Sequence, residues 1–205
     1  MALNFCNNNS LSAITALPAS ISGGGLNLIS TQTASSSSTI SFTSGLDSTY
    51  KEYIFKLINI HPSNDQETLL INFSIDGGSN YNVTKTSSFF MSYNNEAGTA
   101  DVSLEYDTGR DLAQSTSDQS LTQFGIGADN DECGVSIIHL FDPSNTTFVK
   151  HFIAKTNSMG YHSDRYFVSN FCAGYCNTTS AVNAVQFKFN AGTIDSGVIK
   201  LYGVS

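Results

Sequence analysis

The residues best suited to bind a metal are a cysteine pair in the last third of the chain. Cys172 and Cys176 flank Ala173-Gly174-Tyr175, and His162 lies shortly before them. Thiolates and imidazole bind zinc, but the second ligand pair that a structural zinc site needs is missing. On a strand the two cysteines would lie about 13 Å apart, so they could meet only across a turn at 173–175. We therefore expect free, partly buried thiols and no metal site.

Nucleophilic catalysis needs a nucleophile with a base within hydrogen-bond reach. The chain has many serines, and its four histidines are His61, His139, His151 and His162. The Gly-x-Ser-x-Gly elbow that presents a catalytic serine does not occur in the sequence. His139 and His151 fall in predicted strands, so we expect both on sheet faces. These patterns predict that the protein is not an enzyme and that catalytic residues are absent.

The densest acidic cluster is Asp129-Asn130-Asp131-Glu132. Paired carboxylates can hydrolyse glycosides, and oxygen-rich loops can bind calcium. The simpler interpretation is a solvated loop, which we expect here. No cofactor is predicted.

Tyrosines gather near the ends of predicted hairpins, where their rings could stack on a saccharide. The alternative is packing at a rim or a subunit interface, where tyrosine is enriched. The candidate ligand or interface aromatics are Tyr50, Tyr53, Tyr81, Tyr93 and Tyr106.

The charge composition of the chain limits the classes of molecule that it is expected to bind. Charged residues make up only 13% of the chain, the net charge is −8, and the nine basic residues are spread thinly. Without a basic cluster, direct binding to nucleic acid is not expected. A surface rich in Ser, Thr and Asn suits assemblies in which protein meets protein.

No apolar run approaches the roughly 18 residues of a membrane helix, so no membrane span is expected. The segment Met1–Ser12 has neither a basic region nor an apolar core, so we expect no secretory signal and synthesis in the cytoplasm. Disulfides are not expected among the four cysteines.

The clearest strand is Thr68–Asp76, in which Leu69, Ile71, Phe73 and Ile75 alternate with more polar residues. A period of two places these four side chains on one face of a strand. The sequence Asp76-Gly77-Gly78-Ser79-Asn80 follows, and such dipeptides form tight hairpins. The stretch Glu52–Phe90 therefore reads as strand, loop, strand, tight turn and strand.

Glu52–His61 carries apolar residues on both faces. Tyr53, Phe55 and Leu57 alternate with a second set, which comprises Ile54, Ile58 and Ile60. This pattern predicts a central strand or a strand covered by a partner.

Further strands follow at hairpin spacing, and Asp142-Pro143-Ser144-Asn145 is a predicted hairpin connection. They are expected at Leu26–Ala34, Thr39–Ser44, Asp101–Tyr106, Leu121–Ile126, Gly134–Asp142, Thr146–Thr156, Asp164–Asn170, Val182–Phe189 and Val198–Val204. The polar region from Asn94 to Asn130 is expected to be an excursion over the sheet.

About eight to ten strands and no long helix predict an all-β fold, an antiparallel β-sandwich with a jelly-roll-like arrangement. Residues 26–205 are expected to form one domain. Residues 1–25 are expected to form an extended N-terminal arm, because Gly23-Gly24-Gly25 is a flexible joint.

Two parts of the chain resemble a known class of proteins. One runs through Thr39–Tyr50 and Tyr53–Phe55 to Ile75–Tyr81, and the other is the ending Gly197–Val204. Together they resemble virion structural proteins of tailed bacteriophages, especially those of marine and cyanobacterial hosts. The middle of the chain does not take part in the resemblance.

The resemblance implies a β-sandwich exposed on the virion and assembled through protein–protein contacts. The implied partners are further copies of the chain, most simply in a trimer, and other virion proteins. A capsid decoration (cement) protein is the favoured part. The alternative is a tail, baseplate or fibre protein that binds a carbohydrate or receptor on the host surface.

Overall fold

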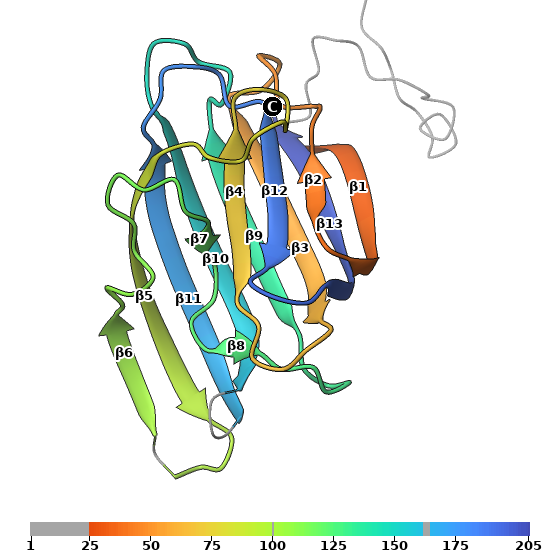
Figure 1. Cartoon of the computed structure of the whole chain (residues 1–205), viewed down its shortest axis with the longest axis vertical. Helices are drawn as coiled ribbons and strands as arrows, with labels where there is room; N and C mark the ends of the chain where they lie inside the picture. The colour runs from red at the N-terminus through yellow and green to blue at the C-terminus, as the bar shows by residue number, and fades with distance from the viewer. Residues whose placement is uncertain (1–24, 100, 162–164) are drawn as a thin grey trace, which may run out of the picture.

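The protein is an antiparallel β-structure of two stacked sheets (Figure 1). The computed structural model describes residues 25–99, 101–161 and 165–205, and over these the chain forms thirteen strands and no helix. The strands are β1 (Leu26–Ser37), β2 (Ile40–Phe42), β3 (Glu52–Pro62), β4 (Leu69–Ser74), β5 (Lys85–Asn95), β6 (Val102–Tyr106), β7 (Gln119–Ser120), β8 (Gly125–Ile126), β9 (Gly134–Phe141), β10 (Lys150–Tyr161), β11 (Arg165–Cys176), β12 (Ala184–Phe189) and β13 (Ile194–Val204).

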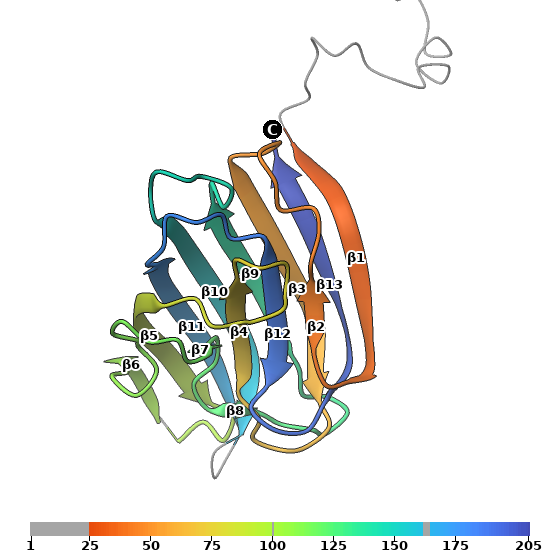
Figure 2. The ribbon, with the colours of Figure 1, turned by 45° about the horizontal axis from the view of Figure 1, so that its top comes forward.

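The large sheet has the order β1-β13-β3-β9-β10-β11-β5-β6, with β8 paired to β10. The small sheet has the order β2-β12-β4-β7 and lies over one face of the large sheet (Figures 1 and 2). The predicted all-β antiparallel sandwich is therefore confirmed. Of the predicted N-terminal arm, residues 1–24 lie outside the described residues.

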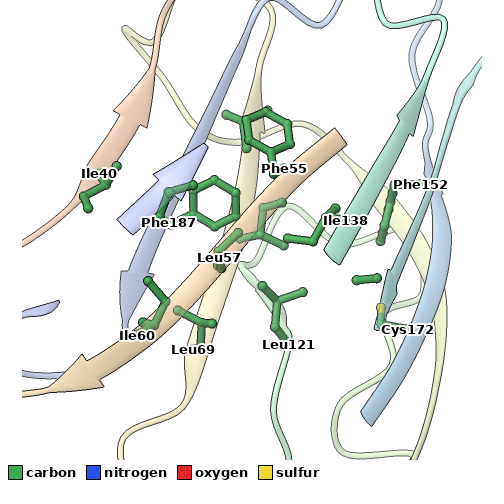
Figure 3. Close-up of a cluster of buried hydrophobic side chains, with 14 of the residues drawn as sticks. Ile40, Phe55, Leu57, Ile60, Leu69, Leu121, Ile138, Phe152, Cys172 and Phe187 are labelled. Atoms are coloured by element: carbon green, nitrogen blue, oxygen red, sulfur yellow. The ribbon is translucent and has the colours of Figure 1, made fainter. Parts of the chain in front are cut away.

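The core fills the space between the two sheets (Figure 3). Strict alternation along β3 turns Tyr53, Phe55 and Leu57 into this space, and all three are buried. The Phe55 ring meets Phe42 of β2 and Phe187 of β12 edge-on, with centroids 5.3 and 5.4 Å apart. Each such side chain contributes about 1.5–3 kcal/mol by leaving water, and the edge-to-face contacts add to this.

The predicted tight hairpin after Thr68–Asp76 is wrong. Gly77 and Gly78 do adopt the positive φ values of +72° and +90° that this turn requires. However, β4 belongs to the small sheet and β5 to the large one, so the two strands do not pair. Strand β4 ends at Ser74, and Ile75 is exposed instead of joining the buried row. The glycine turn could be predicted from the sequence, but the sheet that the following strand β5 joins could not.

The expected face of Ile60 is also wrong. The pairing of β3 with β9 shifts between Leu57 and Ile60, and Asn59 has a φ of +51°. This bulge inserts one residue, so Ile60 turns into the core and is fully buried. Ile54 and Ile58 stay on the opposite face, as predicted.

Several predicted boundaries need correction. The strand expected at Thr146–Thr156 begins only at Lys150, which leaves Phe148 exposed in a loop. The strand expected at Leu121–Ile126 is replaced by β7 and β8, which belong to different sheets. Residues 107–124 thus cross over to the small sheet, which confirms this part of the expected excursion, whereas residues 102–106 form the edge strand β6 of the large sheet.

Some predicted connections are confirmed. The turn that begins at Asp142-Pro143 joins β9 to β10, which pair antiparallel with Phe152 opposite Leu140. The last strand, β13, lies inside the large sheet between β1 and β3.

A buried lysine is an unexpected feature of this core. Lys85 of β5 is fully buried, and its Nζ donates hydrogen bonds to Asn72 Oδ1 at 2.6 Å and to Val83 O at 2.7 Å. Burial lowers the pKa of Lys85 from 10.5 to about 8, because the charged ammonium loses hydration. The folded state therefore releases this proton at a lower pH than the unfolded chain does.

This shift predicts a pH-dependent contribution to stability. Between about pH 8 and 10.5 the unfolded chain binds the Lys85 proton and the folded protein does not, so this group stabilises the fold as pH rises. Relative to Lys85→Met, the parent should gain up to about 3 kcal/mol across this window. Urea unfolding of both proteins from pH 7.5 to 10 measures the difference, which cancels the other titrating groups. A difference independent of pH would contradict the prediction.

Candidate docking surface

The large sheet has a second face, turned away from the small sheet. We call it the open face, and it consists of the outward-pointing side chains of β1, β3, β5, β6, β9, β10, β11 and β13. Register pairs place Tyr202, Ile54, His139 and Ile153 in one continuous row across it. Among the described residues no third layer covers this face, since most of its side chains are exposed or half-buried.

The open face collects the exposed apolar side chains of the molecule. Of the large hydrophobic residues that are exposed in the described ranges, all but Ile75 and Phe148 point to this face. They are Leu26, Leu28, Ile58, Phe90, Val102, Leu104, Tyr106, Val135, Ile137, Ile153 and Phe167. Large contiguous apolar patches are rare on soluble monomers and mark interaction sites.

A shallow depression lies at the centre of the open face, over β3, β9 and β10. Its volume is about 340 Å³. The side chains that line it are Lys56, Leu57, Ile58, Val135, Ser136, Ile137, Lys155 and Asn157. A partner side chain inserted here would meet aliphatic walls and two ammonium groups.

Three lysines form a row across this centre. Register pairs join Lys200 to Lys56, Lys56 to Ile137, and Ile137 to Lys155. None of the ion pairs among the described residues includes these lysines, although Lys56 Nζ lies 5.3 Å from the ring centroid of Tyr202. In a chain with a net charge of −8, the centre of this face is thus locally basic.

An aromatic group lies beside the lysine row, on β5, β6 and β11. Phe90 and Phe171 stack with centroids 4.8 Å apart, and Tyr106 pairs with Phe90 across the strands. The Tyr106 hydroxyl donates a hydrogen bond to Asp111 Oδ2 at 2.7 Å, and this bond raises the pKa of Tyr106. Rigid aromatic side chains of this kind are typical anchors of protein interfaces.

The open face also holds one histidine–carboxylate pair. Nδ1 of His139 lies 2.5 Å from Oε1 of Glu52, which lies on the adjacent strand β3. The cross-strand neighbours of His139 are Ile54 and Ile153, which offer no nucleophile. His139 and His151 both lie on the sheet face, as predicted, and His151 contacts the Tyr175 ring.

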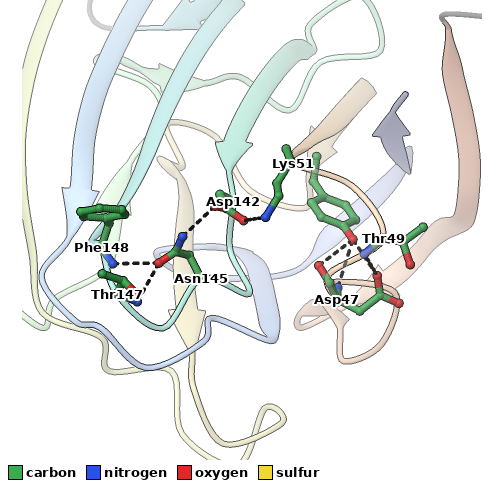
Figure 4. A network of polar contacts seen from close by, with 8 residues as sticks. Asp47, Thr49, Lys51, Asp142, Asn145, Thr147 and Phe148 are labelled. Carbon is green, nitrogen blue, oxygen red and sulfur yellow. Dashed lines mark hydrogen bonds and ion pairs between the residues drawn. The ribbon is translucent and has the colours of Figure 1, made fainter.

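The predicted tyrosines do not form one platform. Tyr53 was expected to be an exposed aromatic, but it is fully buried, because its strand points it into the core. Its hydroxyl lies 2.9 Å from Asp47 Oδ1, and Asp47 Oδ1 also accepts a hydrogen bond from the Thr49 N–H (Figure 4). These bonds fix the turn before β3, and Tyr50 packs edge-on against Tyr53 within that turn. Burial raises the pKa of Tyr53.

The other three tyrosines lie apart. The Tyr93 ring packs on Phe124 and Tyr166 on the core side of the large sheet. Tyr81 is half-buried, and its hydroxyl stands over Gly78. Only Tyr106 lies on the open face, where it is 55% exposed.

The two cysteines are buried and lie on one extended strand. Cys172 and Cys176 both lie within β11, so the turn that would bring their thiols together is absent. Burial raises the pKa of both thiols to about 12, so both are protonated at neutral pH. They are free, as is Cys133, which agrees with the expectation from the sequence. Cys6 and His162 lie outside the described residues.

The acidic cluster at 129–132 forms ion pairs with the side chain of Arg165. Arg165 Nε donates to Glu132 Oε1 at 2.9 Å, and its Nη2 donates to Asp129 Oδ2 at 2.6 Å. His61 Nε2 lies 3.1 Å from the backbone oxygen of Asp129. Arg165 thus engages two of the three carboxylates that a calcium ion would need. Over the described ranges, no group of three or more His, Cys, Asp or Glu side chains is arranged to hold a metal ion.

Sequence reasoning missed the residues that build the open face, above all Lys56, Val135, Ile137 and Lys155. A signal was present, because β3 and β9 both carry apolar side chains in alternate positions on their two faces. On Glu52–His61 that pattern predicted a central strand or a strand covered by a partner, and the structure shows that one face of each of the two strands has no described cover. The lysines gave no signal, because their clustering depends on strand order.

Comparison with protein-family models, with curated proteins and with solved structures finds no match to this chain. No helix long and apolar enough to cross a membrane occurs in the part of the chain that the structure describes.

Two neighbouring isoleucines test whether the open face is uncovered. Ile137 is 46% exposed on the open face, whereas Ile138 is fully buried in the core. We expect Ile138→Ala to lower the free energy of unfolding by about 2–5 kcal/mol, because it leaves a cavity. Ile137→Ala should cost less than about 1 kcal/mol. Denaturant unfolding measures both, and equal costs would show that another segment covers Ile137.

Proposed function

We propose that the protein is a non-enzymatic structural component of a phage virion, and that it attaches to its neighbours through the open face. A capsid decoration (cement) role is the favoured form of this proposal, with synthesis in the host cytoplasm and residence in the virion. The observation that supports it is the concentration of exposed apolar side chains on this one face of the sandwich. The resemblance of the two chain segments to phage virion proteins supports the proposal that the protein resides in the virion.

Exposure of the apolar side chains of the open face to water is unfavourable in free energy. Each exposed aliphatic or aromatic side chain there gains about 25 cal/mol per Å² of apolar surface when a partner covers it. A rigid sheet loses little conformational freedom on docking, so less of that gain is offset by ordering. Ile137, Ile153 and Phe167 are spread over three adjacent strands, which suits a broad, flat contact.

Electrostatics specify the chemistry of the partner. Lys56, Lys155 and Lys200 point to the open face without carboxylate partners among the described residues. A partner surface with carboxylates among its apolar residues would pair with them. The same row disfavours face-to-face contact of two copies about a central twofold axis, because like charges would meet.

A second candidate function rests on the aromatic group of Phe90, Tyr106 and Phe171, with the exposed Phe167 on the same strand as Phe171. Exposed rings on a rigid sheet can stack on sugar rings, which fits the alternative of a tail, baseplate or fibre protein that binds a host glycan. Tyr106 is the one predicted tyrosine in this group.

Docking to particles tests the proposal. Particles of the encoding phage, assembled without this chain, are mixed with the purified protein and sedimented. The parent should bind saturably, whereas Ile137→Asp with Ile153→Asp should lose binding at least tenfold, because charges replace the apolar contact. Ile75→Asp with Phe148→Asp is the matched control, since both residues are exposed outside the open face, and it should bind like the parent.

Two outcomes would contradict the proposal: no binding of the parent, or equal binding by both double variants. If host lipopolysaccharide retains the protein, and Phe90→Ala with Tyr106→Ala abolishes retention while particle docking is absent, the glycan-binding alternative replaces it.

A further inference from the structure

Strand β1 forms one edge of the large sheet and has an unpaired side. It pairs with β13 along its inner side. In both ribbon views, no described segment runs along its outer side (Figures 1 and 2). Over the described residues, no backbone hydrogen bond joins β1 to a segment other than β13. Alternate backbone N–H and C=O groups of an antiparallel edge strand point outward, so β1 presents a row of them.

The sequence of β1 lacks the usual protection of such an edge. The strand is twelve residues long. From Leu26 to Leu46 the chain contains no charged residue and no proline. Edge strands that stay unpaired are usually short, or carry lysine, proline or inward charges that prevent pairing with another chain. The register of β1 against β13 shifts once, at Ile29, and Ser36 near the end of the strand has a left-handed φ of +49°.

The other edge strands of the two sheets are shorter than β1. The opposite edge of the large sheet, β6, has five residues, one of which is Glu105. The edges of the small sheet, β2 and β7, have three and two residues. Three edges are thus too short or too charged to template a strand, and β1 alone is long and neutral.

We infer that β1 is a self-association edge, at which the β1 strand of a second copy pairs antiparallel about a twofold axis. An occupant of this edge needs a long, uncharged strand with a free side, and among the described strands of this chain β1 alone meets that need. The strand that makes this contact carries no charged residue, although each copy has a net charge of −8. Identical neutral strands meet without opposing like charges.

Pairing at β1 joins two large sheets into one continuous sheet. The two open faces then form a single surface, and Leu26 and Leu28 move from its margin to its middle. Both are exposed in the single chain, at 42% and 56%. This inference does not depend on the virion role, and it predicts a dimer, or an assembly of dimers, where the resemblance implies a trimer.

Proline substitutions test the edge. Gln32→Pro and Thr33→Pro, made singly, remove adjacent N–H groups, one of which points outward and the other toward β13. Proline is tolerated on an edge strand only where the lost N–H points outward. Sedimentation equilibrium should show the parent as a dimer. The β1 variant that keeps the parent circular dichroism should dimerise at least about tenfold more weakly, because outward hydrogen bonds are lost.

The opposite edge supplies the matched control. Ser103→Pro and Leu104→Pro lie on β6, and the variant of this pair that stays folded should dimerise like the parent. Amide hydrogen exchange gives a second readout that needs no variant. Exchange of the β1 amides in the parent should slow at least tenfold between low and high protein concentration, while exchange of the β6 amides stays unchanged.

Several results would overturn the inference. They are a parent that is monomeric or trimeric at high concentration, a folded β1 proline variant that still dimerises, and concentration-independent exchange of the β1 amides. A monomeric parent that dimerises only after removal of residues 1–24 would show that this segment covers the edge instead.

Discussion

The structure depends on burial between two sheets of unequal size. The small sheet has four strands and covers one face of the large sheet, and the shared core reaches from Ala34 of β1 to Phe89 of β5. Phe42, Phe55 and Phe187 pack edge-on at that junction and hold the layers together. Because each layer can cover only one face of its neighbour, the second face of the large sheet has no counterpart within the described chain. The open face is thus a direct result of how the core is built.

The charged residues are distributed differently over the covered and the open faces of the large sheet. The acidic residues lie mainly in loops and turns, where Arg165 and Lys51 pair with several of them. Lys85 and Lys150 are buried and bonded to polar groups of the chain. Most of the lysine charge that remains unpaired lies on the open face. A protein with few charged residues thus places a basic centre where its exposed apolar side chains gather.

Sequence patterns predicted the strands well because alternation depends on neighbouring residues alone. The burial of Leu69, Ile71 and Phe73 followed from a period of two. The patterns failed where the outcome depends on distant parts of the chain. A bulge at Asn59 reversed the face of Ile60, and the glycine turn after β4 led into the other sheet. The candidate site was missed for the same reason, because strand order alone brings Lys56, Ile137 and Lys155 together.

The position of β13 between β1 and β3 has a consequence for synthesis. Strand β1 cannot be joined to β3 in the large sheet until residues 194–204, which pair with both, have left the ribosome. Contacts of such high sequence separation form late, because the intervening chain must first be brought together. Until then β1 has no partner strand, and the large sheet stays unfinished.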